Sequence, residues 1–506
     1  MLATLLGAAV PFSSPKVDYH ALAPEVLLAG AICVVIIADL FLEESKKYLL
    51  ATIAGIGLLV PLIPVFTLAV DSGPERSMFG GAYVVDDFSL VLKALFLLAS
   101  YVVVLTSYQY VEDGDYWEGE YYALLLTSTL GMVMISSSRD LISLFVALEL
   151  LSIPSYMLAA WRKRDAKSNE AGVKYFLLGV FSSAIMLYGM SLIYGEVGAT
   201  TFGEVAAFFR SGEVSSSAAL AVIFVLVGFA FKISAVPFHT WAPDAYEGAP
   251  TPITAFFSVS TKAAGFVALV VLVYVAFPFG GDIWQPFLGV LAGLTMTVAN
   301  VVALRQTNIV RMLAYSSISQ GGFMLMPLAV AATSGTSNQP VTAVVTYLLV
   351  YAVTNLGAFA VVIAVARRTR SGEISSYGGL LSHSPGLAVL MTFFMASLAG
   401  VPPLAGWVGK LAAFKAVLSA GTSWANLLAL VAAVNAVISF GYYGNVLKEM
   451  WMKPVPDDVM TGRMKTPSSL NVALGICAVG TVLFGVLPGI VFRFGDLSTI
   501  TGALAK

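Results

Sequence analysis

Long apolar segments recur along almost the whole chain, and they are the feature that most constrains its fold. A helix needs about 20 mostly apolar residues to cross the ~30 Å hydrocarbon core of a bilayer. The chain is 58% hydrophobic and only 11% charged, whereas a typical soluble domain is ~25% charged. Because each segment is too long for a barrel strand, the sequence predicts an all-α polytopic membrane protein.

We predict fourteen transmembrane helices joined by short connections, with no soluble domain between them. The predicted spans cover residues 22–42, 48–70, 89–108, 121–136, 141–161, 173–194, 218–241, 254–277, 284–304, 310–330, 341–366, 387–418, 427–450 and 470–487.

The Lys and Arg residues of the loops indicate an orientation. Loops after odd-numbered spans carry most of them, including Lys46, Arg162, Lys163, Arg311 and Arg367. Such loops face the cytoplasm in most membrane proteins. We therefore expect both termini on the non-cytoplasmic side of the membrane.

Four charged residues interrupt the apolar spans: Glu149, Lys232, Lys262 and Lys410. A charge at the bilayer centre costs ~2.5–3.5 kcal/mol on insertion scales, so such residues need partners or a wet cavity and mark ion or proton pathways. Alternatively, a long lysine stem reaches the lipid headgroups. This alternative fits Lys262 and Lys410 poorly, because they lie far from helix ends, and it stays open for Lys232.

Two spans are predicted to be discontinuous. Pro237 follows Lys232 in the seventh span, and Pro402 and Pro403 precede Lys410 in the twelfth. Proline removes a helical hydrogen bond, and in a bilayer the freed carbonyls must be satisfied by protein or water. A lone proline fits a simple kink, but a proline beside a lysine in two spans favours breaks that border polar cavities.

The two breaks lie five spans apart and therefore have opposite orientations, as inverted repeats require. We predict three N-terminal helices (residues 1–115) and a first repeat of helices 4–8 (116–280). A second, inverted repeat of helices 9–13 (281–452) follows, and then a C-terminal loop with helix 14 (453–506).

Buried lysines suit proton transfer when their charge can be switched. Burial disfavours the charged form, and a nearby carboxylate restores it. Glu149 is the one acidic residue near mid-membrane in the first half, which predicts a contact with Lys232. His239 follows the first break and is either a proton relay or a cap of the break. Asp244 and Glu247 are expected to shape the following loop or to guard its entrance.

Other polar residues lie near the lysines: Thr254, Ser258, Ser260 and Thr261 in the eighth span, and Tyr315, Ser316, Ser317, Ser319 and Gln320 in the tenth. They suit bound water, although Ser and Thr also occur at ordinary helix-packing interfaces. For Lys174, at a membrane boundary, we expect structural pairing. The third span contains Lys93, and the first three spans carry little else polar beyond Glu25 and Asp39, so we expect them to be a packing appendage.

The sequence lacks the motifs of several kinds of cofactor or metal site. Cys33 and Cys477 are single residues in apolar spans, which argues against a disulfide framework or a metal cluster. The chain has no phosphate-binding loop, dinucleotide-binding glycine turn, iron–sulfur cysteine cluster or paired-histidine haem pattern. Other subunits or an ion gradient must therefore supply the energy.

Long stretches of the chain resemble the N-subunit family of respiratory complex I. They include LFVALELLSIPSYMLAAW, FKISAVPFHTWAPDAYEGAPTPITAFFSVSTKAAGF, RMLAYSSISQGGF and GVPPLAGWVGK. Glu149, Lys232, Lys262 and Lys410 match the family's glutamate of span 5 and lysines of spans 7, 8 and 12. The related M-type subunits carry glutamate in place of Lys410, and L-type subunits continue into a long lateral helix.

The resemblance implies a proton-translocating membrane-arm subunit of NADH:quinone oxidoreductase in a bacterial cell membrane, with no redox chemistry in this chain. NADH, FMN, iron–sulfur clusters and quinone would belong to partner subunits. The membrane neighbours would include an M-type subunit and the small subunits toward the quinone site. Protons would enter from the cytoplasm at Lys262 and leave through Lys410, gated by Glu149 and Lys232. The alternatives are an Mrp-type Na⁺/H⁺ antiporter subunit and a structural spacer, the latter disfavoured by the buried lysines.

Overall fold

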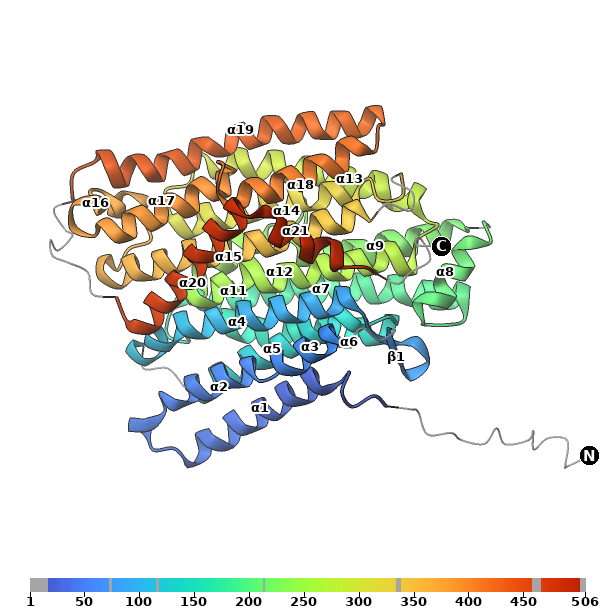
Figure 1. Ribbon diagram of the computed structural model, residues 1–506, viewed down its shortest axis with the longest axis horizontal. Helices are drawn as coiled ribbons and strands as arrows, with labels where there is room; N and C mark the ends of the chain where they lie inside the picture. Colours follow the sequence, from blue (N-terminus) through green and yellow to red (C-terminus); the bar gives the residue numbers. More distant parts are fainter. Residues whose placement is uncertain are drawn as a thin grey trace, which may run out of the picture.

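The computed structural model is a bundle of long helices that run side by side along one direction (Figure 1). It describes residues 17–71, 75–114, 118–212, 214–333, 338–456 and 466–500. Both chain termini, which the sequence predicts on the non-cytoplasmic side, lie outside the described residues.

The N-terminal part is helical apart from one short antiparallel hairpin. It contains α1 (Ala23–Phe41), η1 (Glu44–Lys46), α2 (Leu49–Leu59), α3 (Leu62–Val70), β1 (Arg76–Met78), η2 (Phe79–Gly81), β2 (Tyr83–Val85) and α4 (Asp87–Asp113). In the hairpin, Ser77 of β1 is paired with Val84 of β2.

The middle part contains two π-helical segments, η3 and η4. Its elements are α5 (Glu118–Ser137), α6 (Leu141–Ala159), α7 (Ala166–Val197), α8 (Phe202–Arg210), α9 (Ser216–Lys232), α10 (Trp241–Gly248), α11 (Thr251–Phe256), η3 (Phe257–Thr261), α12 (Lys262–Val271) and η4 (Leu272–Ala276).

The C-terminal part is also helical. Its elements are α13 (Gly281–Ala303), α14 (Ile309–Leu328), α15 (Gln339–Thr369), η5 (Ile374–Tyr377), α16 (Leu380–His383), α17 (Pro385–Ala399), α18 (Ala405–Ser419), α19 (Ser423–Met452), α20 (Ser468–Val486) and α21 (Pro488–Leu497).

Every predicted span coincides with a helix or with consecutive helices, which confirms the all-helical membrane class. Among the described residues, ten helical segments are long and apolar enough to cross a bilayer. The total of fourteen spans and the inverted symmetry stay predictions.

The two predicted breaks are confirmed. α9 ends at Lys232 and α10 begins at Trp241, while α17 ends at Ala399 and α18 begins at Ala405. The second predicted span is one helical segment, Leu49–Val70, with a division between α2 and α3. Pro61 lies at the division, where its ring prevents the regular helical hydrogen bond.

Side-chain caps fix where several helices begin. Asp140 accepts hydrogen bonds from the backbone N–H groups of Ile142 and Ser143 at the start of α6. Asn308 does the same at the start of α14. These oxygens satisfy N–H groups that have no partner within the helix.

Successive connections between the spans lie at alternating ends of the bundle, and the connections at each end contact one another. At one end, here the Arg162 face, Arg367 after α15 pairs with Asp113 of α4 at 2.6 Å, and Arg162 donates to the Gly248 carbonyl. At the other end, the Arg139 face, Arg139 pairs with Asp86 at 2.9 Å. Loops after odd-numbered and even-numbered spans are thus separated, as the predicted topology requires.

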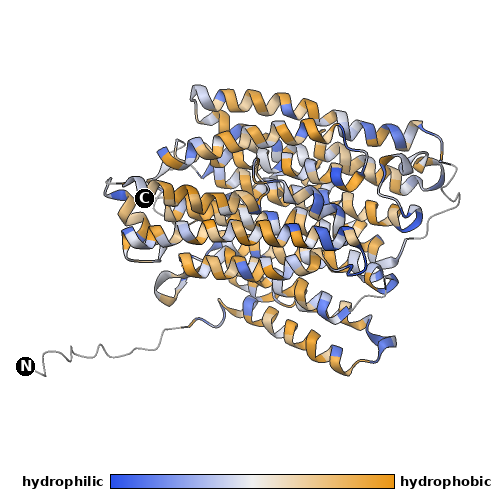
Figure 2. Ribbon diagram, turned by 180° about the vertical axis from the view of Figure 1, so that it is seen from behind, coloured by the Kyte–Doolittle hydropathy of each residue, from blue (hydrophilic) through white to orange (hydrophobic). Residues whose placement is uncertain are grey.

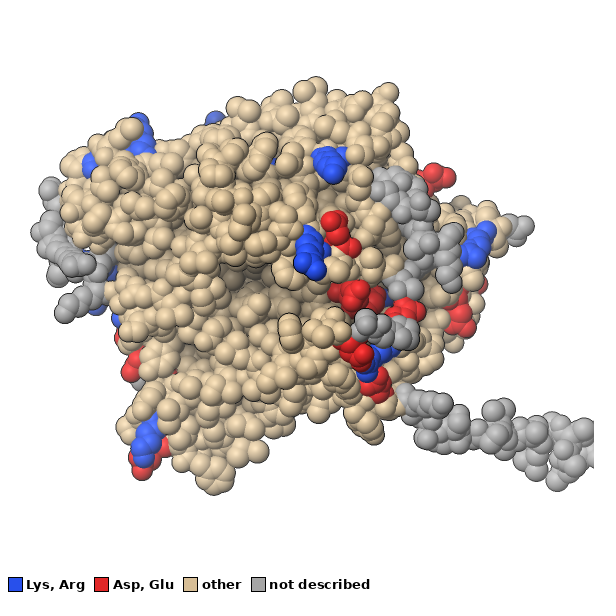
Figure 3. Space-filling view, in the orientation of Figure 1, with Lys and Arg blue, Asp and Glu red and all other residues tan. Residues whose placement is uncertain are grey.

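The bundle has a buried centre and an apolar outer surface. The segment from α11 to η4 is enclosed on all sides, whereas α1, α7 and α19 expose large side chains such as Leu40, Phe181 and Val437. Hydrophobic residues dominate these outer helices (Figure 2). One broad face has a large expanse without charged side chains (Figure 3).

Candidate functional site

Lys232 is the last residue of α9, directly before the first break. Ser234 has a φ of +60° there, a left-handed conformation that ends the helix. The carbonyl of Phe231 accepts hydrogen bonds from the Ser234 N–H and from the Trp241 indole, and the N–H of Val236 donates to Thr295 of α13. Protein groups therefore form hydrogen bonds with the backbone groups at the break, as is necessary in the interior of a bilayer.

The Lys232 ammonium group is buried and bound by neutral hydroxyls. Its Nζ lies 2.9 Å from Ser152 Oγ of α6 and 3.4 Å from Tyr175 Oη of α7. It also lies over the Tyr175 ring, 5.7 Å from the centroid. Lys232 is 3% exposed, so lipid headgroups are out of its reach and the snorkelling alternative is wrong.

The predicted contact between Glu149 and Lys232 is absent, and no ion pair joins them in the described part of the chain. Glu149 Oε1 instead accepts a hydrogen bond from Ser183 of α7, at 2.7 Å. Ser152 lies three residues beyond Glu149, on the same face of α6, and occupies the position that the lysine reaches. Ser152 therefore stands between the two charges along α6.

Lys262 lies in the buried centre of the bundle, where π-helical η3 is followed by α12. It is 1% exposed, and its Nζ lies 2.7 Å from both the carbonyl and the hydroxyl oxygen of Ser317 in α14. π-helical turns within helices occur frequently at functional sites. The polar run predicted in the tenth span thus supplies the partner of this lysine.

Lys410 lies in α18, just after the second break, and is 5% exposed. Its Nζ donates to the Ala399 carbonyl at 2.7 Å and lies 5.1 Å from the centre of the Phe323 ring. Gln320 of α14 donates to the preceding carbonyl, that of Leu398, at 2.9 Å. The lysine and the glutamine thus bind two consecutive carbonyls that the end of α17 leaves free.

A polar network on α14 leads from Lys262 toward Lys410. Gln320 lies one turn beyond Ser317, accepts a hydrogen bond from Tyr347 and donates to Tyr443 at 3.2 Å. Tyr443 is also hydrogen-bonded to Ser316, at 2.5 Å. Nothing in the sequence marks Tyr347 or Tyr443 as part of the site, because tyrosine is common in apolar helices and the partners of these two residues come from other helices.

Several buried polar atoms beside this network have no hydrogen-bond partner among the described residues. They are the hydroxyls of Ser234, Ser260 and Ser319 and the carbonyl oxygen of Asn355. The amide nitrogen of Asn355 binds Ser258 at 2.7 Å. Buried polar atoms that protein does not satisfy generally bind ordered water. The interior between the lysines therefore suits a hydrated path.

His239 lies half-buried between the end of α9 and the start of α10. No hydrogen bond joins it to a lysine within the described ranges, and Trp241 rather than His239 binds the carbonyl of Phe231. Its role as a relay stays a prediction.

A charged cluster fixes α10 at the Arg162 face. Asp244 pairs with Lys174 at 2.7 Å and with Arg311 at 2.8 Å, and Glu247 pairs with Arg311 at 2.9 Å and with Lys167 at 3.1 Å. The segment is a short helix, although the sequence predicts a loop, because these pairs and α7 and α14 hold it. The expected structural pairing of Lys174 is confirmed.

The cluster also sets the charge of its two carboxyl groups. Partial burial alone would raise the pKa of Asp244, but hydrogen bonds from Lys174 and Arg311 hold it below its usual value. Burial is likewise outweighed at Glu247, where Arg311 and Lys167 lower the pKa. Both groups are therefore ionised at neutral pH.

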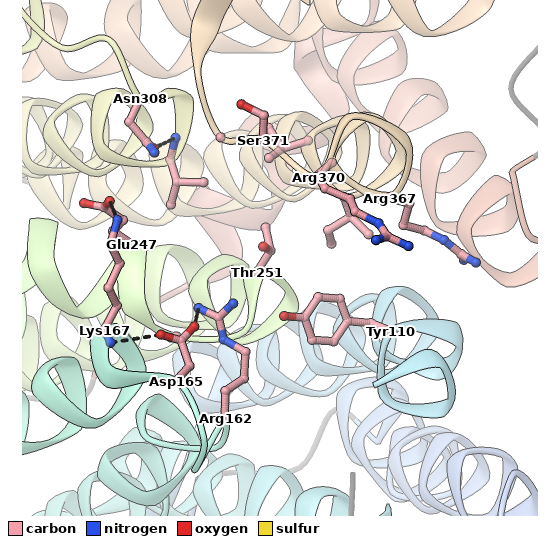
Figure 4. A pocket seen from close by; sticks show the side chains of 16 residues that line it. Tyr110, Arg162, Asp165, Lys167, Glu247, Thr251, Asn308, Arg367, Arg370 and Ser371 are labelled. Atoms are coloured by element: carbon pink, nitrogen blue, oxygen red, sulfur yellow. Dashed lines mark hydrogen bonds and ion pairs between the residues drawn. The ribbon is translucent and has the colours of Figure 1, made fainter. Parts of the chain in front are cut away.

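A cavity of about 410 Å³ opens beside this cluster at the Arg162 face. Figure 4 shows the side chains of Arg162, Tyr110, Thr251 and Arg367 among those that line it, with Glu247 to one side. Thr251 begins α11, the helix that leads through η3 to Lys262. The cavity is thus a vestibule at the surface end of the lysine-bearing segment.

A second buried charge pair lies in the N-terminal helices. Lys93 of α4, fully buried, lies 2.7 Å from Glu25 of α1, and Glu25 also accepts a hydrogen bond from Tyr83 at 2.6 Å. Both residues belong to the first three spans, so this ion pair joins α1 and α4 within the predicted packing appendage. No group of three or more potential metal ligands occurs within the described ranges.

An interior in which Lys232, Lys262 and Lys410 are buried beside two broken helices defines a class of ion-translocating membrane proteins, and comparison with known proteins agrees. The family model described as NADH:quinone oxidoreductase/Mrp antiporter, transmembrane, matches residues 138–438. NADH-quinone oxidoreductase subunit N of Trichlorobacter lovleyi is 40% identical over 95% of this chain and 96% of its own. That of Heliobacterium modesticaldum is 43% identical over 86% of this chain and 89% of its own.

Solved structures agree as well. A chain of respiratory complex I from Thermus thermophilus matches with a TM-score of 0.77 and 32% identity, over 93% of this chain and 98% of that one. A chain of the Mrp complex from Dietzia sp. DQ12-45-1b shares the fold, with a TM-score of 0.83 and 21% identity over 95% and 97%. The chain belongs to the NADH:quinone oxidoreductase/Mrp antiporter family. Within it, the similarity to N subunits confirms the resemblance seen in the sequence.

Proposed function

We propose that this chain is a proton-translocating N subunit in the membrane arm of an NADH:quinone oxidoreductase. The observation that carries the proposal is that Lys232, Lys262 and Lys410 are all buried and all bound by neutral oxygens. A fixed carboxylate would hold a lysine charged, whereas neutral acceptors leave it free to lose its proton. The redox reaction, with NADH, FMN, iron–sulfur clusters and quinone, belongs to partner subunits.

The proposed route begins at the Arg162 face, which we take to be cytoplasmic. Protons enter through the 410 Å³ vestibule and reach Lys262 along α11 and η3. Water bound by the unsatisfied hydroxyls and by Asn355 carries them past Gln320 to Lys410. Lys410 lies on the side of its break nearer the Arg139 face, where release follows.

Glu149 and Lys232 act as the gate in this proposal, with Ser152 between them. The Ser152 hydroxyl donates to the Leu148 carbonyl and accepts from Lys232. If the side chain of Lys232 moves by about one helical turn along α6, its hydrogen-bond partner changes from Ser152 to Glu149. That exchange would change the charge balance of the first half of the subunit without moving a helix.

The proposal includes the finer architecture. The fourteen spans would comprise three N-terminal helices (residues 1–115), two inverted repeats (116–280 and 281–452) and a C-terminal segment (453–506). The two breaks fit this symmetry, because they lie in helices of opposite direction. The two lysines are not themselves equivalent under it: Lys232 precedes its break and Lys410 follows its break, so both lie toward the Arg139 face.

The alternative is an Mrp-type antiporter subunit, and it shares the fold. Reconstitution of the purified complex in liposomes distinguishes the two functions. For an N subunit, NADH and a quinone should drive proton uptake, and Lys262→Met should abolish it while the complex remains assembled. Proton movement driven by a Na⁺ gradient, without NADH, would favour the antiporter.

A further inference from the structure

A pocket of about 690 Å³ lies away from the lysine axis, between α1, α5 and α6 at the Arg162 face. Its walls are apolar on the side toward the membrane, where Ile36, Leu40 and Met157 line it and are 49%, 77% and 54% exposed. Its end toward the Arg162 face is polar, with Asp39, Glu120, Trp161, Lys163 and Asn169. An exposed groove with an apolar outer wall and a polar end matches the two parts of a lipid.

Trp161 is the first sign of a ligand. The side chain is 7% exposed and packs edge to face against Tyr121 with a centroid distance of 5.5 Å. Its indole Nε1 has no acceptor among the described residues, although a buried indole N–H is nearly always hydrogen-bonded. Lys163, two residues further along the chain, lines the same pocket, so an indole N–H donor and a positive charge both lie at this end of the groove.

Asp39 is the second sign. One carboxylate oxygen, Oδ1, is buried without a hydrogen bond in the described part of the chain, and its nearest cation, Lys47, is 3.6 Å away. The carboxylate lies against Gly119 of α5, where a Cβ atom would come within 2.4 Å of Oδ2. Glu120 follows on the same rim. The carboxylates of Asp39 and Glu120 on this rim therefore suit a ligand group with several N–H donors.

We propose that this pocket binds a membrane phospholipid with a primary ammonium headgroup, of the phosphatidylethanolamine class. Its acyl chain lies along Ile36, Leu40 and Met157, and its phosphate lies beside Trp161 and Lys163. Its ammonium group donates hydrogen bonds to Asp39 and Glu120. A choline headgroup has no N–H donor for these carboxylates, and a glycerol headgroup has no positive charge, so both fit the rim less well.

Photo-crosslinking in the intact complex tests this inference. The complex is reconstituted in nanodiscs that contain equal amounts of ethanolamine, choline and glycerol phospholipids, with one headgroup at a time carrying a photoreactive acyl chain. After illumination and digestion, the ethanolamine probe should label peptides of α1 and α6 several-fold more than the choline probe. Glu120→Gln should remove most of that preference, and Trp161→Phe should lower total labelling.

Glu43→Gln is the matched control, because Glu43 is an exposed carboxylate that does not line the pocket. It should keep the wild-type preference. Equal labelling by ethanolamine and choline probes would overturn the inference. So would crosslinks from these peptides to the helix of a neighbouring subunit, which would show that protein fills the groove. The readout is lipid capture, so either outcome is independent of proton transfer.

Discussion

The ammonium group of Lys262 is held by two oxygens of a single residue, because its Nζ lies 2.7 Å from both the carbonyl and the hydroxyl of Ser317. The carbonyl belongs to the backbone of α14 and cannot be removed by substitution, but the hydroxyl can. Ser317 is therefore the residue through which the stabilisation of this charge can be adjusted.

The first prediction concerns that hydroxyl. Ser317→Ala removes one of two acceptors and should lower NADH-driven proton uptake in proteoliposomes several-fold, with the amount of assembled complex unchanged. Ser317→Thr keeps a hydroxyl and should restore most of the rate. If alanine and threonine variants pump equally, the hydroxyl does not stabilise the charged lysine during turnover.

The second prediction concerns the proposed gate. Glu149→Ala and Lys232→Ala should each lower proton pumping by about tenfold, which corresponds to ~1.4 kcal/mol, in complexes that still assemble. Ser152→Ala removes the hydroxyl between them and should have an intermediate effect. Ser155→Ala is the control on the same helix, because Ser155 binds Leu151 and Ser128 rather than the lysine. Wild-type pumping by Glu149→Ala would remove the gate from the mechanism.

The third prediction concerns topology. In a background with Cys33→Ser and Cys477→Ser, Arg164→Cys and Arg370→Cys should both react with a membrane-impermeant maleimide only from the cytoplasmic side. Arg210→Cys, after an even-numbered span, should react only from the opposite side. Labelling of the first two cysteines from different sides would contradict the fourteen-span topology and with it the inverted repeats.

The fourth prediction concerns the charged cluster around α10. Because the pKa values of Asp244 and Glu247 are lowered in the folded protein, their stabilising effect is present above the ordinary carboxyl pKa of about 4. It is lost as pH falls through the lowered values. Hydrogen exchange of the α10 peptide, corrected for intrinsic rates, should therefore be faster after a pulse at pH 3 than at pH 5.

Asp244→Asn should weaken that pH dependence, because it removes the carboxylate that two cations share. For partly exposed pairs the loss is on the order of 1 kcal/mol. Glu204→Gln, at the opposite end of the bundle, serves as a control and should leave exchange at α10 unchanged. Equal exchange of wild type and Asp244→Asn at both pH values would show that packing alone holds this helix.

Hydropathy and proline positions sufficed to predict the spans and the two breaks, because both follow from local chemistry. The partner of Lys232 could not be predicted in this way. A lysine side chain reaches several positions on a neighbouring helix, and only the packing of α6 against α9 brings Ser152 rather than Glu149 within 2.9 Å. The π-helical segment before Lys262 was missed for a similar reason, because no residue type marks it in the sequence.

The short helices α8 and α21 were also missed. Each is too short to register as a span, and its position depends on contacts with distant segments. Gly495 of α21, for example, lies so close to α15 that a Cβ would come within 2.7 Å of Thr346 Oγ1.

The last prediction separates a proton carrier from a fixed charge at Lys410. Its Nζ donates to the Ala399 carbonyl at the end of α17, a bond that stabilises either a permanent charge or a transient one. Arginine keeps the charge but holds its proton at any physiological pH, so Lys410→Arg should lose most proton pumping in assembled complexes. Glutamate can titrate when buried, so Lys410→Glu should retain part of the function.

Lys415→Arg is the matched control, because Lys415 is an exposed lysine on the same helix, and it should pump as the wild type does. Lys410→Met, which has a similar length and no charge, shows whether the site tolerates substitution, since it should assemble and fail to pump. An assembled Lys410→Arg complex that pumps normally would show that Lys410 supplies only a fixed positive field. The proton would then have to bypass α18 through the Gln320–Tyr443 network.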